Sequence, residues 1–465
     1  MQNALTMPPV AASENQPLQS RVDGPAVLAL KARDNATNWK YLAIVWGIIG
    51  ATTGAALYVE SLILASGASL WWMVPVVVLA AIVTGGSQHQ LGGVIHEGTH
   101  FTLFENKRLN ELASDWLGAF AIYTSTYQYR VHHLAHHQFV NDPERDPDIS
   151  QLKDSDHWLD FPVAHIDVLK KLAKQLYLPN LVRFTLVRAR YSAVGHDDNP
   201  YVDKSETRSK LPVYAGIYFA VAIPFIVSTL LKGTSAATAW TVLIASYLAV
   251  IGYFARLPES QFPQTRLLPV ISHRATAIGR MTFLFLLYAA FTAYDSAAAG
   301  TGVAWAFDHY GLFWAMPLFT TFPLYMMMRQ WVQHGNADRG RYTNTRVFLT
   351  GPLFRYCVLP WGMDYHLPHH MMASVPHYNL KALHELLLAD PKYKAEGLVV
   401  EGVIGHHHHD GKQRPNILDV IGPDFAPKQR SAAHVDNNTL EYAEVRGAAA
   451  IAREAALSAS GRPSS

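Results

Sequence analysis

The chain has 465 residues, of which half are hydrophobic and only 16% are charged. Because soluble domains carry roughly a quarter charged residues, this deficit indicates that much of the surface faces lipid and excludes an ordinary soluble protein. The net charge of +2 implies no nucleic-acid partner, and the one cysteine, Cys357, excludes a disulfide framework, a four-cysteine zinc site and a cysteine-bound iron–sulfur cluster.

Apolar stretches predict membrane-spanning helices after a polar N-terminal tail at 1–39, which is expected to be disordered. A helix needs about 20 mostly apolar residues to cross a bilayer. The stretches that approach this length are 41–63, 69–88, 211–231, 237–255, 281–298 and 311–328. Runs such as LPVYAGIYFAVAIPFIVSTLL lack a polar face, which favours spans over the buried helices of a soluble protein.

Basic residues predict the orientation of these spans. The short links at 64–68, 232–236 and 299–310 contain one Lys or Arg, whereas 107–210 contains fourteen and 256–280 contains four. Loops rich in Lys and Arg stay in the cytoplasm, so both termini and both long loops are expected on that side. The expected fold is all-α: a multi-pass transmembrane helix bundle with a cytoplasmic helical cap.

Three histidine clusters fall at this cytoplasmic edge. They are HEGTH (96–100), HHLAHH (132–137) and HLPHH (366–370). Residues three and four apart share one face of a helix, so the histidines within each cluster are expected to point the same way. A proline is tolerated only near the start of a helix, so the third cluster is expected to open a helix just after Asp364.

Neutral imidazole is a common ligand of zinc, iron, copper and nickel. The clusters hold more imidazoles than one ion can use, whereas two ions with four to five nitrogens each would use them all. The candidate ligands are His96, His100, His133, His136, His137, His334, His366, His369 and His370, with His132 as a further possible ligand. The helical phase shared with His136 and His137 favours His133 over His132.

Other histidines and other metal proteins fit less well. The run at 406–409 and the isolated His309 and His434 are expected to be solvated or hydrogen-bonded. HEGTH has the spacing of a zinc protease helix, but a protease has no use for the other two clusters. A membrane metal transporter is a remote alternative, because transporters place their ligands near the midplane of the membrane, whereas these clusters lie beyond the ends of the spans.

The three clusters resemble those of the membrane fatty acid desaturase family, whose pattern is HxxxH, HxxHH and HxxHH. The segments HEGTHFTLFENKRLNELASDWLG, YRVHHLAHHQFVNDPERDPD and YHLPHHMMASVPHYNLKALHELL carry the likeness, which covers residues 40–390. We therefore expect a desaturase-like membrane domain at 40–395 and a partly disordered cytoplasmic extension at 396–465. The resemblance implies two iron ions on the histidines, and it implies that Gln330 replaces the asparagine that holds a water molecule in the family.

The resemblance also implies an activity: an oxidoreductase that uses O2 to remove hydrogen from a CH2–CH2 pair of a lipid or acyl chain. No side chain can break such a C–H bond, so a redox metal must supply that chemistry. Hydroxylation, or decarboxylation to a terminal alkene, remains an alternative, because substrate placement decides the outcome. The electrons are expected from a separate ferredoxin, rubredoxin or cytochrome b5-type protein. The basic segment 170–190 is predicted to bind either that donor or anionic lipid headgroups.

Supporting residues are predicted around the ligands. A metal-bound histidine usually donates its second ring proton to a carboxylate or carbonyl group. The candidates for such supporting contacts are Glu97, Asn141, Asp142, Asp146, Asp148 and Asp364. Arg130 is expected to pair with one of these acids, and Gln330 lies four residues before His334, on the same helix face.

Overall fold

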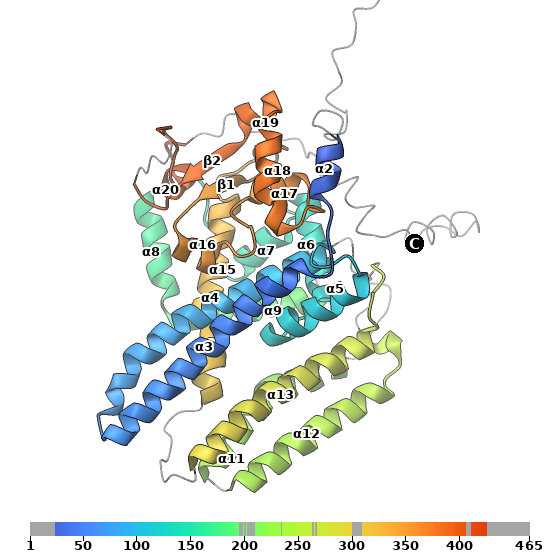
Figure 1. The fold of residues 1–465 in the computed structure, drawn as a ribbon, viewed down its shortest axis with the longest axis vertical. Helices are drawn as coiled ribbons and strands as arrows, with labels where there is room; N and C mark the ends of the chain where they lie inside the picture. Colours follow the sequence, from blue (N-terminus) through green and yellow to red (C-terminus); the bar gives the residue numbers. More distant parts are fainter. Residues whose placement is uncertain are drawn as a thin grey trace, which may run out of the picture.

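The fold was analysed in a computed structural model, in which long helices form one end of the molecule and short helices form a cap at the other (Figure 1). The structure describes residues 24–194, 199, 201, 210–233, 235–262, 265, 267–299, 309–405 and 411–425. The histidine run at 406–409, His434 and most of the predicted N-terminal tail lie outside the described residues.

Within the described residues, six helical stretches are long and apolar enough to cross a membrane, which confirms the six predicted spans. They are Thr37–Ser66, Leu70–Thr99, Leu211–Gly233, Ala236–Arg256, His273–Ala297 and Gly311–His334. Their elements are α3 (Thr37–Ser66), η1 (Leu70–Trp72), α4 (Met73–Thr99), α10 (Leu211–Ile217), η4 (Tyr218–Ala222), α11 (Ile223–Gly233), α12 (Ala236–Arg256), α13 (His273–Ala299), η6 (Gly311–Ala315), α14 (Met316–Phe319) and α15 (Thr321–His334). The chain is therefore a multi-pass, all-α membrane protein.

The second and sixth helices extend beyond the spans predicted from the sequence. Their last turns are polar and so lack the apolar pattern of a span, but they are buried within the protein. In α4 the predicted span stops at residue 88, yet the helix runs to Thr99, and Gln88, His89 and Glu97 are buried against other elements. Helices α3, α15 and α16 all pack on α4. Helix α4 is therefore central to the fold, and its end lies within the protein rather than in lipid.

Proline interrupts the third span, and a hydroxyl group from another span compensates for it. Pro224 has no N–H group to donate to the carbonyl of Ala220, four residues earlier. The chain forms a π-helical turn there, η4, and the hydroxyl of Tyr288 in α13 donates to this carbonyl at 2.9 Å. This contact ties the third span to the fifth.

The cap consists of short elements packed around the ends of α4 and α15. They are α2 (Gly24–Leu30), α5 (Lys107–Ser114), η2 (Asp115–Ala119), η3 (Phe120–Ile122), α6 (Thr126–Phe139), α7 (Pro147–Asp154), α8 (His165–Gln175), α9 (Leu178–Val194), η5 (Glu259–Gln261), β1 (Arg346–Leu349), α16 (Pro352–Val358), α17 (His366–Met371), η7 (His377–Asn379), α18 (Leu380–Leu387), α19 (Pro391–Glu396), β2 (Leu398–Glu401) and α20 (Ile417–Ile421). Strands β1 and β2 pair in parallel, with Arg346 opposite Leu398.

Two parts of the cap differ from the predicted boundaries. Residues 24–30, placed in the disordered tail by the sequence, form helix α2, because Val27 is buried against α18 and the side chain of Asn379 donates to the carbonyl of Leu30. In the predicted extension, Val400 and Ile417 belong to the same hydrophobic core as Trp331. The described part of the extension is therefore continuous with the membrane domain in its packing.

A buried ionisable triad lies near the opposite end of the spans from the cap. It consists of Glu60 in α3, Asp295 in α13 and His309, which precedes η6. The Nε2 atom of His309 lies 2.9 Å from a carboxylate oxygen of Glu60, and its Nδ1 atom donates to Asp295. Because both ring nitrogens face carboxylates, both carry protons and the ring is positively charged. His309 is thus hydrogen-bonded, as expected.

Candidate metal centre

The three histidine clusters and His334 meet at the cap end of the spans. The first cluster ends α4, with His96 in the last turn and His100 as the residue that caps it. Helix α6 carries the second cluster and starts at Ser125, whose hydroxyl accepts from the N–H of Gln128. Helix α17 carries the third and begins at His366, as predicted.

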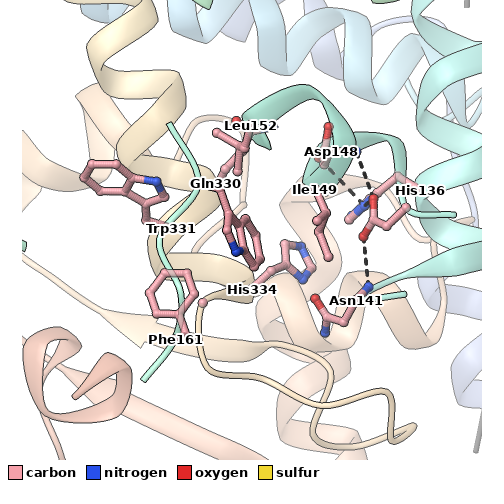
Figure 2. A pocket seen from close by; sticks show the side chains of 12 residues that line it. His136, Asn141, Asp148, Ile149, Leu152, Phe161, Gln330, Trp331 and His334 are labelled. Carbon is pink, nitrogen blue, oxygen red and sulfur yellow. Dashed lines mark hydrogen bonds and ion pairs between the residues drawn. The ribbon is translucent and has the colours of Figure 1, made fainter. Parts of the chain in front are cut away.

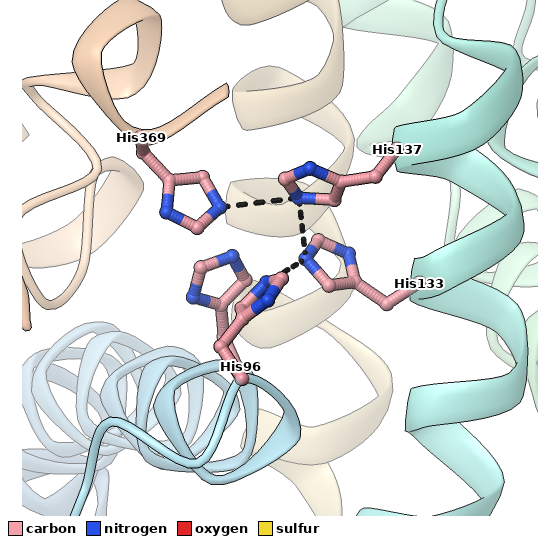
Figure 3. A group of neighbouring side chains, drawn as sticks. His96, His133, His137 and His369 are labelled. Atoms are coloured by element: carbon pink, nitrogen blue, oxygen red, sulfur yellow. Dashed lines mark hydrogen bonds between the residues drawn. The ribbon is translucent and has the colours of Figure 1, made fainter. Parts of the chain in front are cut away.

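The nine predicted ligands divide into two groups, and within each group one nitrogen per residue lies within 4.8 Å of all the others. The five-histidine group is His96, His100, His133, His137 and His369 (Figure 3). The four-histidine group is His136, His334, His366 and His370. The rings of His137 and His370 stack with centroids 4.3 Å apart, so the two groups are adjacent.

The HH doublets explain why two groups form. Successive residues on a helix point about 100° apart, so two adjacent histidines cannot face the same point. Accordingly His137 belongs to the five-histidine group and His136 to the other, while His369 and His370 divide in the same way. Each HxxHH motif therefore supplies histidines to both groups and holds the groups side by side.

The spacing of the nitrogens fits a bound cation. The Nε2 atom of His133 lies 2.9 Å from that of His100 and 3.0 Å from that of His137, and His334 and His366 approach to 3.0 Å. Two nitrogens that bind one ion at right angles are about 3 Å apart, given metal–nitrogen bonds of about 2.1 Å. Both ring nitrogens of His96 are buried without a hydrogen-bond partner in the described part of the chain. These residues therefore fit a pair of metal ions.

Burial keeps most of these rings in the form that binds metal. Burial first, and then the neighbouring imidazoles, hold the pKa of His133, His137 and His369 well below its ordinary value. The rings are therefore neutral near pH 7, with a lone pair available. His136 differs: burial alone would lower its pKa, but the carboxylates of Asp146 and Asp148 outweigh burial and raise it.

Asp146 is the predicted supporting residue that contacts a ligand directly. Its Oδ1 atom accepts from Nδ1 of His136 at 2.9 Å, which leaves Nε2 directed at the four-histidine group. Its Oδ2 atom accepts from the backbone N–H of Asn141 at 2.9 Å. The side chain of Asn141 in turn donates to the carbonyl of Asn344, which also accepts from Nδ1 of His334. Asp146 and Asn141 thus link the positions of two rings in this group.

Glu97 and Asp364 lie near the groups but bind other partners. Glu97 accepts from the hydroxyl of Thr102 and from the backbone N–H of His377, each at 3.0 Å, and its carboxylate is 3.7 Å from Nδ1 of His96. Asp364 pairs with Arg355 at 3.0 Å. Glu97 therefore joins α4 to the segment after α17. His377 supplies the backbone N–H for this contact, and no role was predicted for it from the sequence.

The predicted partner of Arg130 is wrong. Arg130 pairs with Glu111 of α5, at 2.7 Å, and not with any of the acids proposed from the sequence. Its Nε atom donates to the carbonyl of Thr99 and its Nη2 atom to that of Gly98. Both side chains of the pair are almost fully buried. Arg130 therefore holds the end of α4, between His96 and His100, against α5 and α6.

His132 belongs to neither group. Its Nε2 atom lies 2.7 Å from Oδ1 of Asp148, which also accepts from Arg188 of α9. On α6, His132 lies four residues before His136, and both rings reach Asp148, but His132 is out of step with His133 and His137. The possible ligand role of His132 is therefore not supported by its position.

Gln330 lines a pocket beside the four-histidine group (Figure 2). The pocket also contacts His136, His334, Asp148 and Trp331. The Oε1 atom of Gln330 is buried without a hydrogen-bond partner in the described residues, and its Nε2 atom is 3.5 Å from Gln151. The wall of the pocket is partly apolar, and an unused acceptor beside His136, Asp148 and His334 is suited to hold a water molecule there.

Gly98, in the middle of HEGTH, allows α5 to pack against the end of α4. A Cβ atom at this position would come within 2.1 Å of the hydroxyl oxygen of Ser114. The carbonyl of Gly98 also accepts from Asn110 and from Arg130, each at 2.9 Å. Any side chain at this position would push the first cluster away from α5.

We expect Gly98→Ala to lower the free energy of unfolding by about 1–3 kcal/mol, because the core is overpacked, and to reduce bound metal. Thermal unfolding and metal analysis of the purified protein would measure both effects. Gly92→Ala is the matched control on the same helix, where a Cβ atom meets its nearest neighbour at 3.8 Å. Equal metal content in the two variants would contradict the role given to Gly98.

Together, the spans and the two histidine groups define a multi-pass membrane protein with a candidate two-metal centre at one end of its helices. Comparison with protein families then identifies the chain. The family model described as fatty acid desaturase matches residues 69–291 and 259–399. The chain belongs to the fatty acid desaturase family.

Two relatives are similar over shorter segments. Dihydrorhizobitoxine desaturase of Bradyrhizobium elkanii is 31% identical over 117 residues, which cover 25% of this chain and 30% of the relative. Delta(5) fatty acid desaturase fat-4 of Caenorhabditis elegans is 39% identical over 70 residues, which cover 15% of this chain and 16% of the relative. The matched segments thus span less than a third of each of these relatives.

Proposed function

We propose that this chain is a membrane-bound di-iron fatty acyl desaturase. It introduces a double bond into a long hydrocarbon chain with O2 and electrons from outside the chain. The observation that carries the proposal is the pair of adjacent, buried groups made only of histidines, in a chain of the fatty acid desaturase family. The six apolar helices support the proposal, because a centre at their end would lie close to lipid, where an acyl substrate resides.

Iron is the metal that this proposal requires. All-imidazole sites suit iron, copper and zinc, but only a redox-active pair can pass electrons to O2. The five-histidine group would hold one ion and the four-histidine group the other. When bound, the metal pair supplies the chemistry of O2 reduction and C–H cleavage. The balanced reaction takes one CH2–CH2 pair, O2, two electrons and two protons to one CH=CH pair and two waters.

The residues around the two groups have four tasks in this mechanism. Asp146 orients the ring of His136, and the carbonyl of Asn344 orients that of His334. Burial keeps bulk water away from the ligands, which favours neutral rings. Gln330 accepts a hydrogen bond from a water molecule in the pocket beside the four-histidine group. The Arg130–Glu111 pair fixes the end of α4 from outside.

The orientation and the electron donor are part of the proposal. The fourteen basic residues of 107–210 favour a cytoplasmic position for the centre and for both termini. Electrons then come from a separate ferredoxin, rubredoxin or cytochrome b5-type protein that reaches the cap from the cytoplasm. The one cysteine of the chain leaves no cysteine set for an iron–sulfur cluster of its own.

Expression of the full chain in a host, followed by lipid analysis, tests the proposed function. Desaturation predicts new double bonds in acyl chains that disappear in the His137→Ala variant. A new hydroxyl group would instead indicate hydroxylation, and a hydrocarbon shorter by one carbon would indicate decarboxylation. If the protein bound two metal ions per chain but consumed no O2 in the presence of a reduced donor, the proposal of an oxygen-dependent enzyme would be contradicted.

We expect Gln330→Ala to lower turnover about 10- to 100-fold, as is usual for residues that support a metal site from outside. Bound metal should fall much less, since Gln330 lies in neither histidine group. Turnover and metal content are measured on the same preparation. Gln333→Ala is the matched control on α15: this side chain donates to the carbonyl of Met363 instead of facing the pocket. Full activity of Gln330→Ala would show that the water is held by another residue.

A further inference from the structure

Helix α8 has an apolar face that no element of the described residues covers. Its buried face carries Val168 and Gln175, which pack toward the cap. On a helix of about 100° per residue, Ile166 and Leu169 lie on a separate face from these two. Ile166 is 57% exposed and Leu169 is 51% exposed. The helix therefore presents a second hydrophobic face to its surroundings.

This face continues into the turn that joins α8 to α9. Leu176 is 71% exposed, Tyr177 is 66% exposed and Leu178 is 50% exposed. Leu186, two turns further along α9, is also exposed. We call Leu176–Leu178 the α8–α9 corner. Three adjacent large apolar side chains at a turn are costly in water but stable in lipid.

The third face of α8 is basic. Lys170 and Lys174 are exposed next to the apolar face, and Lys171 follows on the side toward the cap. Lys170 pairs with Asp167 and Lys174 pairs with Asp156. Both pairs are exposed, and such pairs hold their partners weakly, so the ammonium groups remain available to an anion.

The packing of α9 gives the depth of the corner. Arg188, in the second half of α9, contacts Asp148 at 3.2 Å and so lies level with the four-histidine group. Helix α9 packs on both α14 and α15 of the sixth span, and its Phe184, one turn before Arg188, belongs to the same core as Leu318 and Phe322 there. Those two residues precede His334 by 12 to 16 positions, about 18–24 Å along a helix. The first half of α9 therefore lies beside the interior of a membrane span.

Leu178 precedes Arg188 by ten positions, about 15 Å along the axis of α9. Of α8 and α9, the corner is therefore the part that lies furthest from the level of the histidine groups, in the direction in which the spans enter the membrane. In Figure 1, α8 descends along the outside of the molecule from the cap toward the long helices. A water-soluble electron donor cannot cover a surface at this depth.

We propose that the α8–α9 corner is inserted into the membrane leaflet next to the histidine groups, with the lysines of α8 on anionic phospholipid headgroups. Leucine and tyrosine side chains on one face and lysines beside them are the pattern of a helix that lies in a membrane interface. The corner ties the cap to the bilayer, so the histidine groups keep a fixed height above the acyl chains. This inference concerns membrane position and does not require that the chain is a desaturase.

Depth-dependent fluorescence quenching tests the insertion. The Tyr177→Cys variant of the full chain is labelled with a fluorophore and placed in nanodiscs that contain spin-labelled phosphatidylcholine. The native Cys357 is buried, and the unsubstituted protein gives its background. We expect quenching as strong as at Val78→Cys, an exposed position in the second span, and far stronger than at Lys394→Cys on α19. Quenching at Tyr177→Cys no stronger than at Lys394→Cys would overturn the proposal.

The headgroup contact has its own test. Phosphatidylglycerol is added to phosphatidylcholine nanodiscs, and the rise in unfolding temperature is compared between the protein and the triple variant K170Q/K171Q/K174Q. We expect the triple variant to lose most of this rise. The matched variant K381Q/K392Q/K394Q, which removes equal charge from α18 and α19, should keep it. An unchanged rise in the α8 variant, together with weaker binding of a reduced donor protein, would assign these lysines to the donor and overturn the lipid contact.

Discussion

Replacement of His133 by alanine is expected to reduce bound metal to one ion per chain or fewer and to abolish product formation. The Nε2 atom of His133 lies about midway in the five-histidine group, 2.9 Å from that of His100 and 3.0 Å from that of His137. Its loss removes the ring that lies in contact with both of these neighbours, so the four remaining histidines no longer surround one point and water can enter the space between them. Metal analysis and lipid analysis of the purified variant measure the two effects.

His384→Ala is the control for this variant. His384 is a partly buried histidine of α18 whose Nδ1 atom bonds to the hydroxyl of Tyr393, and it belongs to neither group. It should retain both ions and full activity. The ligand assignment would be refuted by a His133→Ala protein that folds, keeps two ions per chain and still forms product.

The second large effect is expected from Arg130→Met. This change leaves the carboxylate of Glu111 buried without its partner, and loss of one member of a buried ion pair costs about 3–5 kcal/mol of stability. It also removes the donors to the carbonyls of Gly98 and Thr99. We therefore expect a much lower unfolding temperature and poor metal retention, both measured in the same detergent or nanodisc preparation.

The double variant R130M/E111L separates the two roles of Arg130. Removal of both charges should restore most of the stability, because no buried charge remains unpaired. Metal retention should stay low, since the hydrogen bonds from Arg130 to the carbonyls of Gly98 and Thr99, next to His100, are still missing. If the double variant recovered both properties, Arg130 would be needed only as the partner of Glu111 and not to position the first cluster.

The spans and the histidine clusters could be predicted because their signals are local. Apolar length identified all six spans, and the spacing within HHLAHH separated His133 from His132. The ends of α4 and α15 could not be predicted from apolar length. Their last turns are buried by neighbouring elements, so polar residues such as Gln88 replace the apolar pattern that lipid would require.

The supporting residues were harder to predict because their contacts are long-range. Glu111 reaches Arg130 only through the packing of α5 on α4, which depends on the absence of a side chain at Gly98. Asp146 was identified because it lies ten residues from His136 in an acidic segment that follows the second cluster. Helix α2 was missed because seven residues are too few to show a periodic pattern, and one buried residue, Val27, holds it in place.

The triad at the far end of the spans has a consequence for how the protein is made. Glu60 enters the bilayer with the first hairpin, 249 residues before His309 is synthesised. Until then its carboxyl group has no cationic partner, so an early hairpin is held only weakly in the membrane. The segment that supplies His309 also ends in His334. Insertion of that last hairpin therefore completes the buried triad at one end of the spans and brings His334 to the cap at the other. Correct insertion is thereby coupled to assembly of the candidate metal centre.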